Sequence, residues 1–205
     1  MLRLVVATTN RGKLREIEML LDGIPLTLVT LADWPDIPPP DETGRTFAEN
    51  ARLKAVYYAN HTGQLTVAED SGLEIDALGG APGVESARFG GAGSSYPAKF
   101  ALIYDALRAK KDGPPTARFV CALALAAGDD VVFEARGTVD GVIAPEPKGS
   151  GGFGYDPIFY YPPFGCTLAE ASAEQKATVS HRGEAFRKLR TFLTTYNAEP
   201  LRTQS

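Results

Sequence analysis

The sequence predicts a mixed α/β fold, because apolar runs of strand length alternate with segments of helical periodicity. Residues 2–7 form a short apolar run with β-branched side chains, and apolar residues at helical spacing follow in 14–21. Residues 119–125 and 131–135 are alternating apolar runs separated by a glycine-containing turn, the pattern of a β-hairpin. A strand–helix start combined with a hairpin predicts a sheet with both parallel and antiparallel strands.

Length and composition limit the class of protein. The 205 residues fit one large domain, 1–205, with a frayed tail at about 196–205. The formal net charge is −4, so we expect no nucleic-acid partner, whose binders are usually clearly basic. No segment approaches membrane-spanning length, so we expect no membrane association. Cys121 and Cys166 are the only cysteines, which indicates no disulfide scaffold and favours the cytoplasm.

A polar turn follows the first predicted strand and opens the first helix. The turn consists of Thr8, Thr9, Asn10, Arg11, Gly12 and Lys13. Asn10 or Thr9 can cap the helix, whose first N–H groups and neighbouring cations then favour an anion. The stretch resembles a P-loop but lacks its first glycine and has Leu14 after the lysine, so we reject that interpretation. The alternative is an ordinary polar turn.

A second strand, a stiff connector and a second helix come next. Residues 26–31 have the apolar pattern of a strand, and 34–40 contain four prolines, which exclude regular structure. Thr46 and Glu49 form a capping box, so we expect a helix over about 47–60.

Three polar residues in this region have functional potential. Asn50 and Lys54 lie four apart, and therefore on one face of the predicted helix. Glu42 belongs to the acidic turn before it. Lys54 and Glu42 are each equally compatible with a solvated surface.

The stretch 65–73 places two acids and a hydroxyl together. Glu69, Asp70 and Ser71 follow an apolar run, and Gly72 is a turn signal, so we expect the strand to end there. Ligands of open α/β sheets bind beyond the carboxyl ends of strands. Adjacent carboxylates usually need a metal ion or a proton beside them. The alternative is a solvated acidic turn.

The middle of the chain is expected to be mainly structural. Residues 79–93 are rich in glycine, which indicates unusual backbone geometry or close approach of another surface. A helix is expected over about 95–107, with Ser95 at its start. Residues 119–125 are apolar on both faces, so this strand is expected to be central.

A glycine-rich loop at 149–154 matches the letters G-x-G-x-x-G, but a strand follows it instead of a helix, which excludes a dinucleotide fold. The loop presents Phe153, Tyr155 and Asp156. An aromatic side chain can stack on a base, and a carboxylate can accept from a base or sugar. The alternative is that both aromatic side chains pack into the core.

The last part of the chain carries a second capping box and the last helix. Ser172 and Gln175 form the box, and Lys176 follows it. Ser180 is the expected N-cap of the last helix, which puts His181 and Arg182 at its positive end. Cations at the positive end of a helix are normally unfavourable, and exceptions to such local preferences concentrate at functional sites.

The chain resembles the inosine/xanthosine triphosphate pyrophosphatase (ITPase-like) family. The resemblance rests on 8–13 (TTNRGK), 42–44 (ETG), 47–51 (FAENA), 69–73 (EDSGL), 79–83 (GGAPG), 151–157 (GGFGYDP) and 180–183 (SHRG), in the family's order. It implies a two-lobed α/β fold with a long, mixed, twisted sheet flanked by helices and a nucleotide cleft between the lobes, usually as a homodimer. It implies hydrolysis of dITP, ITP and XTP to the monophosphate and pyrophosphate with Mg²⁺.

The resemblance also implies roles for individual residues. Asp70 matches the proton acceptor and metal-binding carboxylate, and Glu42 the other metal-associated acid. The triphosphate contacts match Thr8, Thr9, Asn10, Arg11, Gly12, Lys13 and Lys54, with Ser71 beside them. The nucleoside pocket matches Phe153, Gly154, Tyr155, Asp156, Lys176, His181 and Arg182. Many members have Asp where this chain has Glu69, which leaves open whether Glu69 touches the metal directly or through water.

The residue chemistry agrees with this activity. We find no nucleophilic cysteine or Ser-His-Asp set, which favours direct attack by water with Asp70 as proton acceptor. The N–H groups at 180–183 and the Arg182 guanidinium are donors suited to the 6-carbonyl of hypoxanthine or xanthine, so we expect Arg182 to discriminate ITP from ATP. The alternatives are a nucleotide sensor without turnover and a pyrophosphatase for another modified nucleoside triphosphate.

Overall fold

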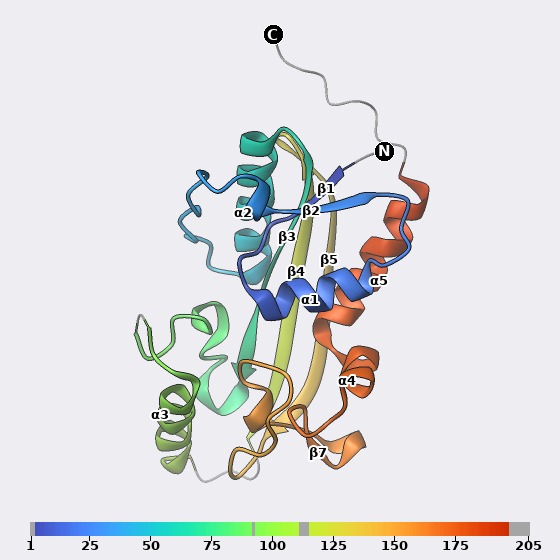
Figure 1. Ribbon diagram of the computed structural model, residues 1–205. Helices are drawn as coiled ribbons and strands as arrows, with labels where there is room; N and C mark the ends of the chain where they lie inside the picture. Colours follow the sequence, from blue (N-terminus) through green and yellow to red (C-terminus); the bar gives the residue numbers. More distant parts are fainter. Residues whose placement is uncertain (1–2, 92, 111–114, 197–205) are drawn as a thin grey trace. The chain divides into compact units, whose positions relative to one another are not determined.

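The computed structural model describes residues 3–91, 93–110 and 115–196 (Figure 1), so most of the predicted frayed tail lies outside the described residues. The chain divides into two compact units. Unit 1 contains Met1–Asp70, Cys121–Gly137 and Arg182–Ser205, and unit 2 contains Ser71–Val120 and Thr138–His181.

The described elements alternate between strands and helices up to the fourth strand, after which come three further strands and then two helices. In chain order they are β1 Arg3–Val6, α1 Arg11–Leu20, β2 Thr27–Thr30, α2 Phe47–Thr62, β3 Leu65–Ile75, α3 Tyr96–Arg108, β4 Thr116–Ala127, β5 Asp130–Ile143, β6 Phe159–Tyr161, β7 Cys166–Thr167, α4 Ala173–Val179 and α5 His181–Thr195. The strand order is β2-β1-β3-β4-β5-β6-β7. β1 pairs in parallel with β2 and β3, whereas β6 pairs antiparallel with β5 and β7. The predicted mixed α/β fold is confirmed.

In unit 1, helices cover both faces of the strands (Figure 1). α1 and α5 lie on one side of β1 and β3, and α2 lies on the other. Side chains alternate along a strand, so every second residue faces α1 and α5. These residues form a buried cluster that contains Leu4, Val6, Leu65, Val67, Cys121 and Leu123 from the strands and Ile17, Leu21, Phe186 and Leu189 from the helical segments. The cluster explains the strand and helix periodicities in the sequence.

Unit 2 has its own apolar cluster. It contains Leu73 and Ile75 of β3, Phe100 and Ile103 of α3, and Phe119, Val139, Ile143 and Phe159 of the later strands. Phe119 and Phe159 contact each other with ring centroids 4.5 Å apart. The predicted α3 therefore buries the apolar face that its spacing indicated.

Most predicted helix starts are confirmed by their caps. Asn10 caps α1, Ser95 caps α3, and Ser172 closes a complete capping box with Gln175. Thr46 caps α2 by accepting from Glu49 N at 3.1 Å. The Glu49 carboxylate accepts from Arg45 N instead of completing the box at Thr46. Local side-chain oxygens thus satisfy the first N–H groups of these helices.

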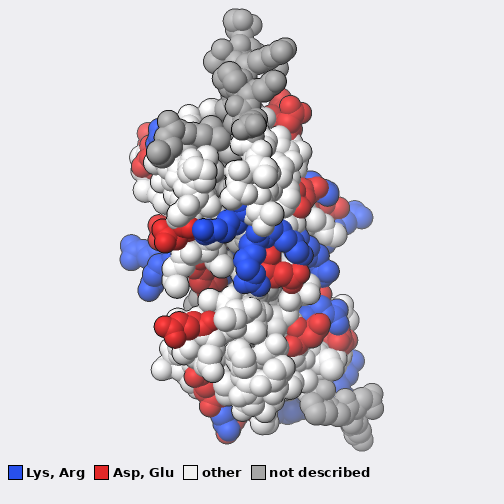
Figure 2. All heavy atoms as spheres, turned by 90° about the vertical axis from the view of Figure 1, so that its right-hand side faces the viewer, with Lys and Arg blue, Asp and Glu red and all other residues white. Residues whose placement is uncertain are grey.

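On the face drawn in Figure 2, basic side chains gather in one region, with acidic side chains among and beside them. Among the described residues, no helix combines the length and the apolar character that a membrane span requires.

The expectation that the acidic strand ends at Asp70 and Gly72 is wrong, because β3 continues to Ile75. Gly72 serves close packing instead of a turn. A Cβ at Gly72 would lie 2.3 Å from Ser86 Oγ and 2.7 Å from the Gly83 carbonyl oxygen. The missing side chain lets the 83–86 segment lie against the strand, and Ser86 Oγ accepts from Leu73 N at 2.9 Å.

We expect Gly72→Ala to destabilise the protein by about 3 kcal/mol. The added methyl group would overlap both the Gly83 carbonyl oxygen and the Ser86 side chain, and the strand and the 83–86 segment would have to move apart to accommodate it. Thermal or urea unfolding measures the loss. Gly63→Ala is the comparison, since Gly63 has φ +63° but no atom within 4 Å of its Cβ position, and its backbone strain costs about 1 kcal/mol. Equal losses in the two variants would show that crowding at Gly72 is not the cause.

Candidate active site

The two neighbouring acids of β3 point to opposite faces of the strand, as the two-residue period requires. Glu69 continues the series of Leu65 and Val67 and lies on the side of α1 and α5. Asp70 lies on the opposite side, against α2. The two carboxylates therefore have different hydrogen-bond partners within unit 1, although the charges of Lys13 and Lys54 lower the pKa of both.

Asp70 is held by two side chains from successive turns of α2. Asn50 Nδ2 donates to Asp70 Oδ2 at 3.1 Å, and Lys54 Nζ lies 3.4 Å from Asp70 Oδ1. Lys54 Nζ also lies 2.8 Å from Glu42 Oε1. Asn50 is fully buried, and its Oδ1 accepts from Gly44 N at 2.8 Å. The amide is thus fixed by the acidic turn on one side and orients Asp70 on the other.

The electrostatic surroundings of Asp70 suit a proton acceptor. Burial raises the pKa of Asp70, against the opposing effects of Lys54 and Asn50. Burial tends to lower the pKa of Lys54, but Asp70 and Glu42 raise it overall. Lys54 therefore stays charged at neutral pH, and Asp70 is a somewhat stronger base than an exposed aspartate.

The carboxylates of Asp70 and Glu42 fit a hard divalent cation. Both already contact one cationic atom, Lys54 Nζ, so their oxygens converge on a common region. The described residues contain no group of three or more His, Cys, Asp or Glu side chains suited to a metal. Two carboxylates match Mg²⁺, which commonly takes one or two of them together with water and substrate phosphates.

The predicted polar turn 8–13 follows β1, and its residues from Arg11 onward already form the first turn of α1. Asn10 Oδ1 accepts from Gly12 N at 2.9 Å and from Lys13 N at 3.1 Å. Thr8 Oγ1 accepts from Asn10 N at 3.2 Å. Because Asn10 satisfies two of the helix N–H groups, the groups that this turn can offer to an anion are mainly side chains, including those of exposed Thr9 and Arg11.

Glu69 forms the centre of a buried ion network in unit 1. Arg182 Nε donates to Glu69 Oε1 at 3.0 Å, and Lys13 Nζ lies 3.2 Å from the same oxygen. Arg182 Nη1 donates to Glu16 Oε2 at 2.6 Å, and Cys121 Sγ lies 3.4 Å from Glu69 Oε2. Burial works to raise the pKa of Glu69, but the charges of Arg182 and Lys13 hold it well below its usual range.

Asp156 and Lys176 organise the glycine-rich loop in unit 2. Asp156 Oδ2 accepts from Phe153 N at 2.8 Å and from Lys176 Nζ at 2.7 Å, and both charged side chains are buried. Lys176 Nζ also lies 4.6 Å from the centre of the Phe153 ring. A Cβ at Gly152 would come within 2.1 Å of Asp156 Oδ2, so this packing requires glycine. The loop thus presents a half-buried Phe153 backed by a cation.

The other predicted residues of unit 2 are placed separately. Tyr155 is buried, and its hydroxyl donates to the Ser86 carbonyl at 2.8 Å, so this aromatic side chain packs into the core. His181 is buried and stacks on Phe119 with ring centroids 5.0 Å apart. Gly154 has φ +69°, and Ser71 is partly exposed on β3. Tyr155 therefore supports the loop from the core.

Sequence reasoning missed three residues of this region. Asn50 was noted only for its spacing from Lys54, although it belongs to the 47–51 motif. Glu16 and Cys121 carry no local signal, because their contacts with Arg182 and Glu69 join residues distant in the chain. Arg182 was expected to face a ligand, and its guanidinium is buried between carboxylates of unit 1.

Comparisons with known proteins give a consistent family. The family model described as the Ham1 family matches residues 4–192. A dITP/XTP pyrophosphatase of an Exiguobacterium species is 48% identical over 92% of this chain and 95% of its own length. That of Geobacter sulfurreducens is 48% identical over 94% of this chain and 97% of its own. The structure of a HAM1 protein from Coxiella burnetii matches with a TM-score of 0.90 and 39% identity, covering 96% of this chain and all of that one.

We expect Glu69→Gln to lower the free energy of unfolding by about 3–5 kcal/mol, because it leaves Arg182 and Lys13 without their buried counter-charge. Urea unfolding at pH 7 measures the loss. Asp70→Asn is the matched control on the other face of β3, and it relieves a carboxylate whose burial is unfavourable. A larger loss in the control would contradict the assigned roles.

The same pair of proteins gives a pH test. The folded-state pKa of Glu69 is depressed, so its stabilisation is present above the unfolded pKa of about 4.3 and is lost as the pH falls toward the folded value. The stability difference between the native protein and Glu69→Gln should be constant from about pH 8 to 5 and narrow below about pH 4. A stability difference between the two proteins that stays constant down to pH 2.5 would exclude the ion pairs of Glu69 with Arg182 and Lys13.

Proposed function

The chain belongs to the Ham1 family, and from this premise we infer that it is a nucleoside triphosphate pyrophosphatase acting on deaminated purine nucleotides. It hydrolyses dITP, ITP and XTP to the nucleoside monophosphate and pyrophosphate. The single observation that best supports the chemistry is the arrangement of Asp70, Lys54 and Glu42, in which a buried base and a second acid meet a lysine.

The proposed reaction is direct attack by water on the α-phosphorus. As the water oxygen forms a bond to the α-phosphorus, Asp70 accepts a proton from that water. The bond between the α-phosphorus and the oxygen that bridges to the β-phosphate breaks, and pyrophosphate leaves with that bridging oxygen. The raised pKa of Asp70, which burial causes, suits a proton acceptor. Asn50 holds the Asp70 carboxylate in place through its amide.

Pyrophosphatases of this kind generally need a divalent metal, and we propose Mg²⁺ held by Asp70 and Glu42. When bound, it would neutralise phosphate charge in the transition state. Lys54 and Lys13 carry the remaining positive charge toward the triphosphate, together with the side chains of Thr8, Thr9, Asn10 and Arg11 and the backbone of Gly12. Glu69 is a positioning residue in this proposal, because its carboxylate holds Lys13 and Arg182.

The nucleoside is proposed to bind through residues of unit 2. Phe153 offers a ring for stacking, backed by Lys176, and Asp156 fixes both through its carboxylate. Gly154, Tyr155 and His181 complete the set predicted for the nucleoside, and Ser71 is proposed to lie beside the triphosphate contacts. Arg182 is proposed to act indirectly, because its guanidinium already donates to Glu69 and Glu16.

We further propose that the chain acts as one domain over 1–205, as a homodimer in the cytoplasm. Both cysteines are free thiols, which agrees with a reducing compartment. Sedimentation equilibrium of the purified protein tests the dimer.

A substrate panel tests the proposed function. The purified protein is incubated with Mg²⁺ and dITP, ITP, XTP, ATP, GTP or modified pyrimidine triphosphates, and pyrophosphate and orthophosphate are measured separately. Pyrophosphate release is expected from the deaminated purine nucleotides. Binding without turnover would favour a nucleotide sensor. Activity confined to a pyrimidine substrate would favour a pyrophosphatase for another modified nucleoside triphosphate.

We expect Asp70→Asn to lower turnover on ITP by about 100-fold or more with folding intact, since a positioned acid–base group contributes about that much. Glu42→Gln should raise the Mg²⁺ concentration needed for half-maximal rate. Glu134→Gln is the matched control, because Glu134 pairs only at the surface with Arg52. Near-normal turnover of Asp70→Asn would exclude the assigned proton acceptor.

We expect Arg182→Ala to lower kcat/KM on ITP and ATP by the same factor and to lower the melting temperature, because the buried guanidinium holds Glu69 and not the base. Phe153→Ala should instead raise KM, with little change in stability. The measurement is the ratio of kcat/KM on the two substrates. A loss confined to ITP would return the base-reading role to Arg182.

A further inference from the structure

Tyr96 is a large aromatic side chain at the first position of α3 that has no part in the proposed reaction, and it is 38% exposed. Ser95 caps the helix and Pro97 follows, so the backbone of Tyr96 belongs to the rigid start of a helix. Its hydroxyl oxygen lies 3.6 Å, and its Cζ 3.8 Å, from the position that a Cβ of Gly154 would occupy. The ring therefore lies against the backbone of the glycine-rich loop, one residue after Phe153.

A cluster of three aromatic rings joins α3 to the residue that follows the loop. The rings of Tyr96 and Tyr155 meet edge to face, with centroids 5.3 Å apart. Phe100, one turn further along α3, lies 6.2 Å from each of these rings. Edge-to-face pairs are favoured by the charge distribution of the rings. The cluster therefore ties the end of the loop to the helix.

The buried side chain of Lys99 supports the Tyr96 ring. Its ammonium lies 4.8 Å from the centre of that ring, a distance at which a cation attracts the ring face. The same ammonium donates to the carbonyl oxygens of Ala87 at 2.6 Å and Ser86 at 3.3 Å. The Ser86 carbonyl also accepts from the Tyr155 hydroxyl. Lys99 is thus linked to Tyr155 both through Tyr96 and through Ser86.

The loop needs support of this kind because its backbone is intrinsically flexible. Gly152 and Gly154 have φ of +65° and +69°, and glycine loses more conformational freedom on ordering than any other residue. Asp156 fixes the backbone N–H of Phe153. A protein of which only a fraction is in the binding-competent conformation binds more weakly, in proportion to that fraction. Packing against Gly154 therefore increases the fraction of loops that present Phe153.

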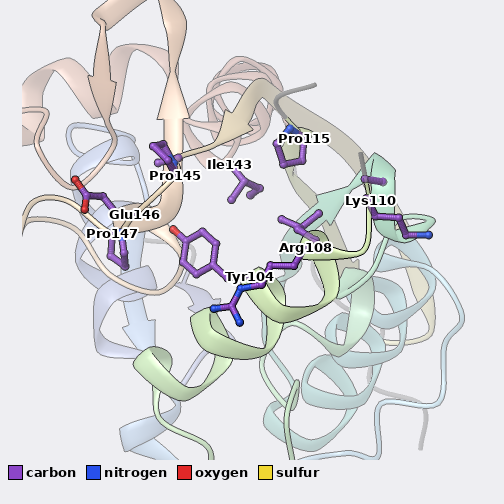
Figure 3. Close-up of a pocket in the computed structure, with 11 residues that line it drawn as sticks. Tyr104, Arg108, Lys110, Pro115, Ile143, Pro145, Glu146 and Pro147 are labelled. Atoms are coloured by element: carbon purple, nitrogen blue, oxygen red, sulfur yellow. The ribbon is translucent and has the colours of Figure 1, made fainter. Parts of the chain in front are cut away.

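The C-terminal half of α3 has different neighbours. Tyr104 and Arg108 border a pocket whose lining also includes Pro145 and Glu146 (Figure 3). None of the described residues that line this pocket belongs to the loop 149–154. The contacts that bear on the loop therefore come from the N-terminal half of the helix.

We propose that Tyr96 is a positioning residue, which keeps Phe153 ready to stack on the base of the substrate. It acts through its contacts with Gly154 and Tyr155 and does not touch the substrate itself. The inference rests on the proposed function, because that function assigns the base to Phe153. Loss of the Tyr96 ring weakens nucleoside binding and leaves the chemistry at Asp70, in unit 1, unchanged.

The kinetic test compares Tyr96→Ala, Tyr96→Phe and Leu102→Ala on ITP. Leu102 is the matched control, since it is 44% exposed on the same helix and its side chain lies against Gly90. Tyr96→Ala should raise KM about five- to tenfold and change kcat less than about twofold, because the competent fraction of the loop falls. Tyr96→Phe keeps the ring and should have the native KM, as should Leu102→Ala.

Three kinetic outcomes would overturn the inference. A native KM in Tyr96→Ala would show that the ring does not position the loop. A KM in Tyr96→Phe as high as in Tyr96→Ala would show that the hydroxyl acts instead of the ring. An equal rise in Leu102→Ala would show a general effect of truncating side chains on α3.

A measurement without substrate separates this inference from the proposed function. NMR hydrogen exchange follows the Phe153 N–H, which donates to Asp156 in the native protein. Exchange should be at least about fivefold faster in Tyr96→Ala and native in Tyr96→Phe, while the amides of β4 keep their native rates. Unchanged exchange at Phe153, or an equal acceleration in β4, would overturn the positioning role. A native protein that releases no pyrophosphate from ITP would contradict the proposed function, and the exchange rates would still decide whether Tyr96 positions the loop.

Discussion

The two-residue period of β3 is the constraint on which the site in unit 1 depends. Two acids adjacent in sequence are sent to opposite faces, one toward α1 and α5 and the other toward α2. A strand that ended at Asp70 would have placed both carboxylates in one turn, where they would repel each other. The continuous strand lets Glu69 pair with the cations on one face while Asp70, on the other face, keeps a raised pKa.

The two carboxylates differ accordingly in their pKa. Burial dominates at Asp70 and raises its pKa, whereas the charges of Arg182 and Lys13 overcome burial at Glu69 and lower it. Pairs of acids whose surroundings shift their pKa values apart commonly divide into a reactive and a permanently charged group. The charge of Glu69 is matched by cations of unit 1, and a direct bond from Glu69 to a metal would have to replace them.

Local signals in the sequence were sufficient for the elements and insufficient for the network. Asn10, Ser95 and Ser172 cap helices because their side chains reach N–H groups two or three residues ahead, so sequence alone locates them. Gly72 misled the prediction, since a glycine required by the proximity of Ser86 looks the same as one required by a turn. The burial of Arg182 depends on Glu69, 113 residues away, and no local rule specifies such a contact.

Both lysines that we propose to bind phosphate are paired with carboxylates in the structure. Lys13 contacts Glu69, and Lys54 contacts Asp70 and Glu42. A lysine without such partners would be costly to hold in a half-buried position, so the carboxylates allow the cations to be placed in advance. Lys54 can turn fully to a phosphate only when another cation balances Glu42 and Asp70. We therefore expect binding of the divalent metal and binding of the triphosphate to favour each other. The metal would free Lys54 for the phosphates, and the triphosphate, by drawing Lys54 away, would free the carboxylates of Glu42 and Asp70 for the metal.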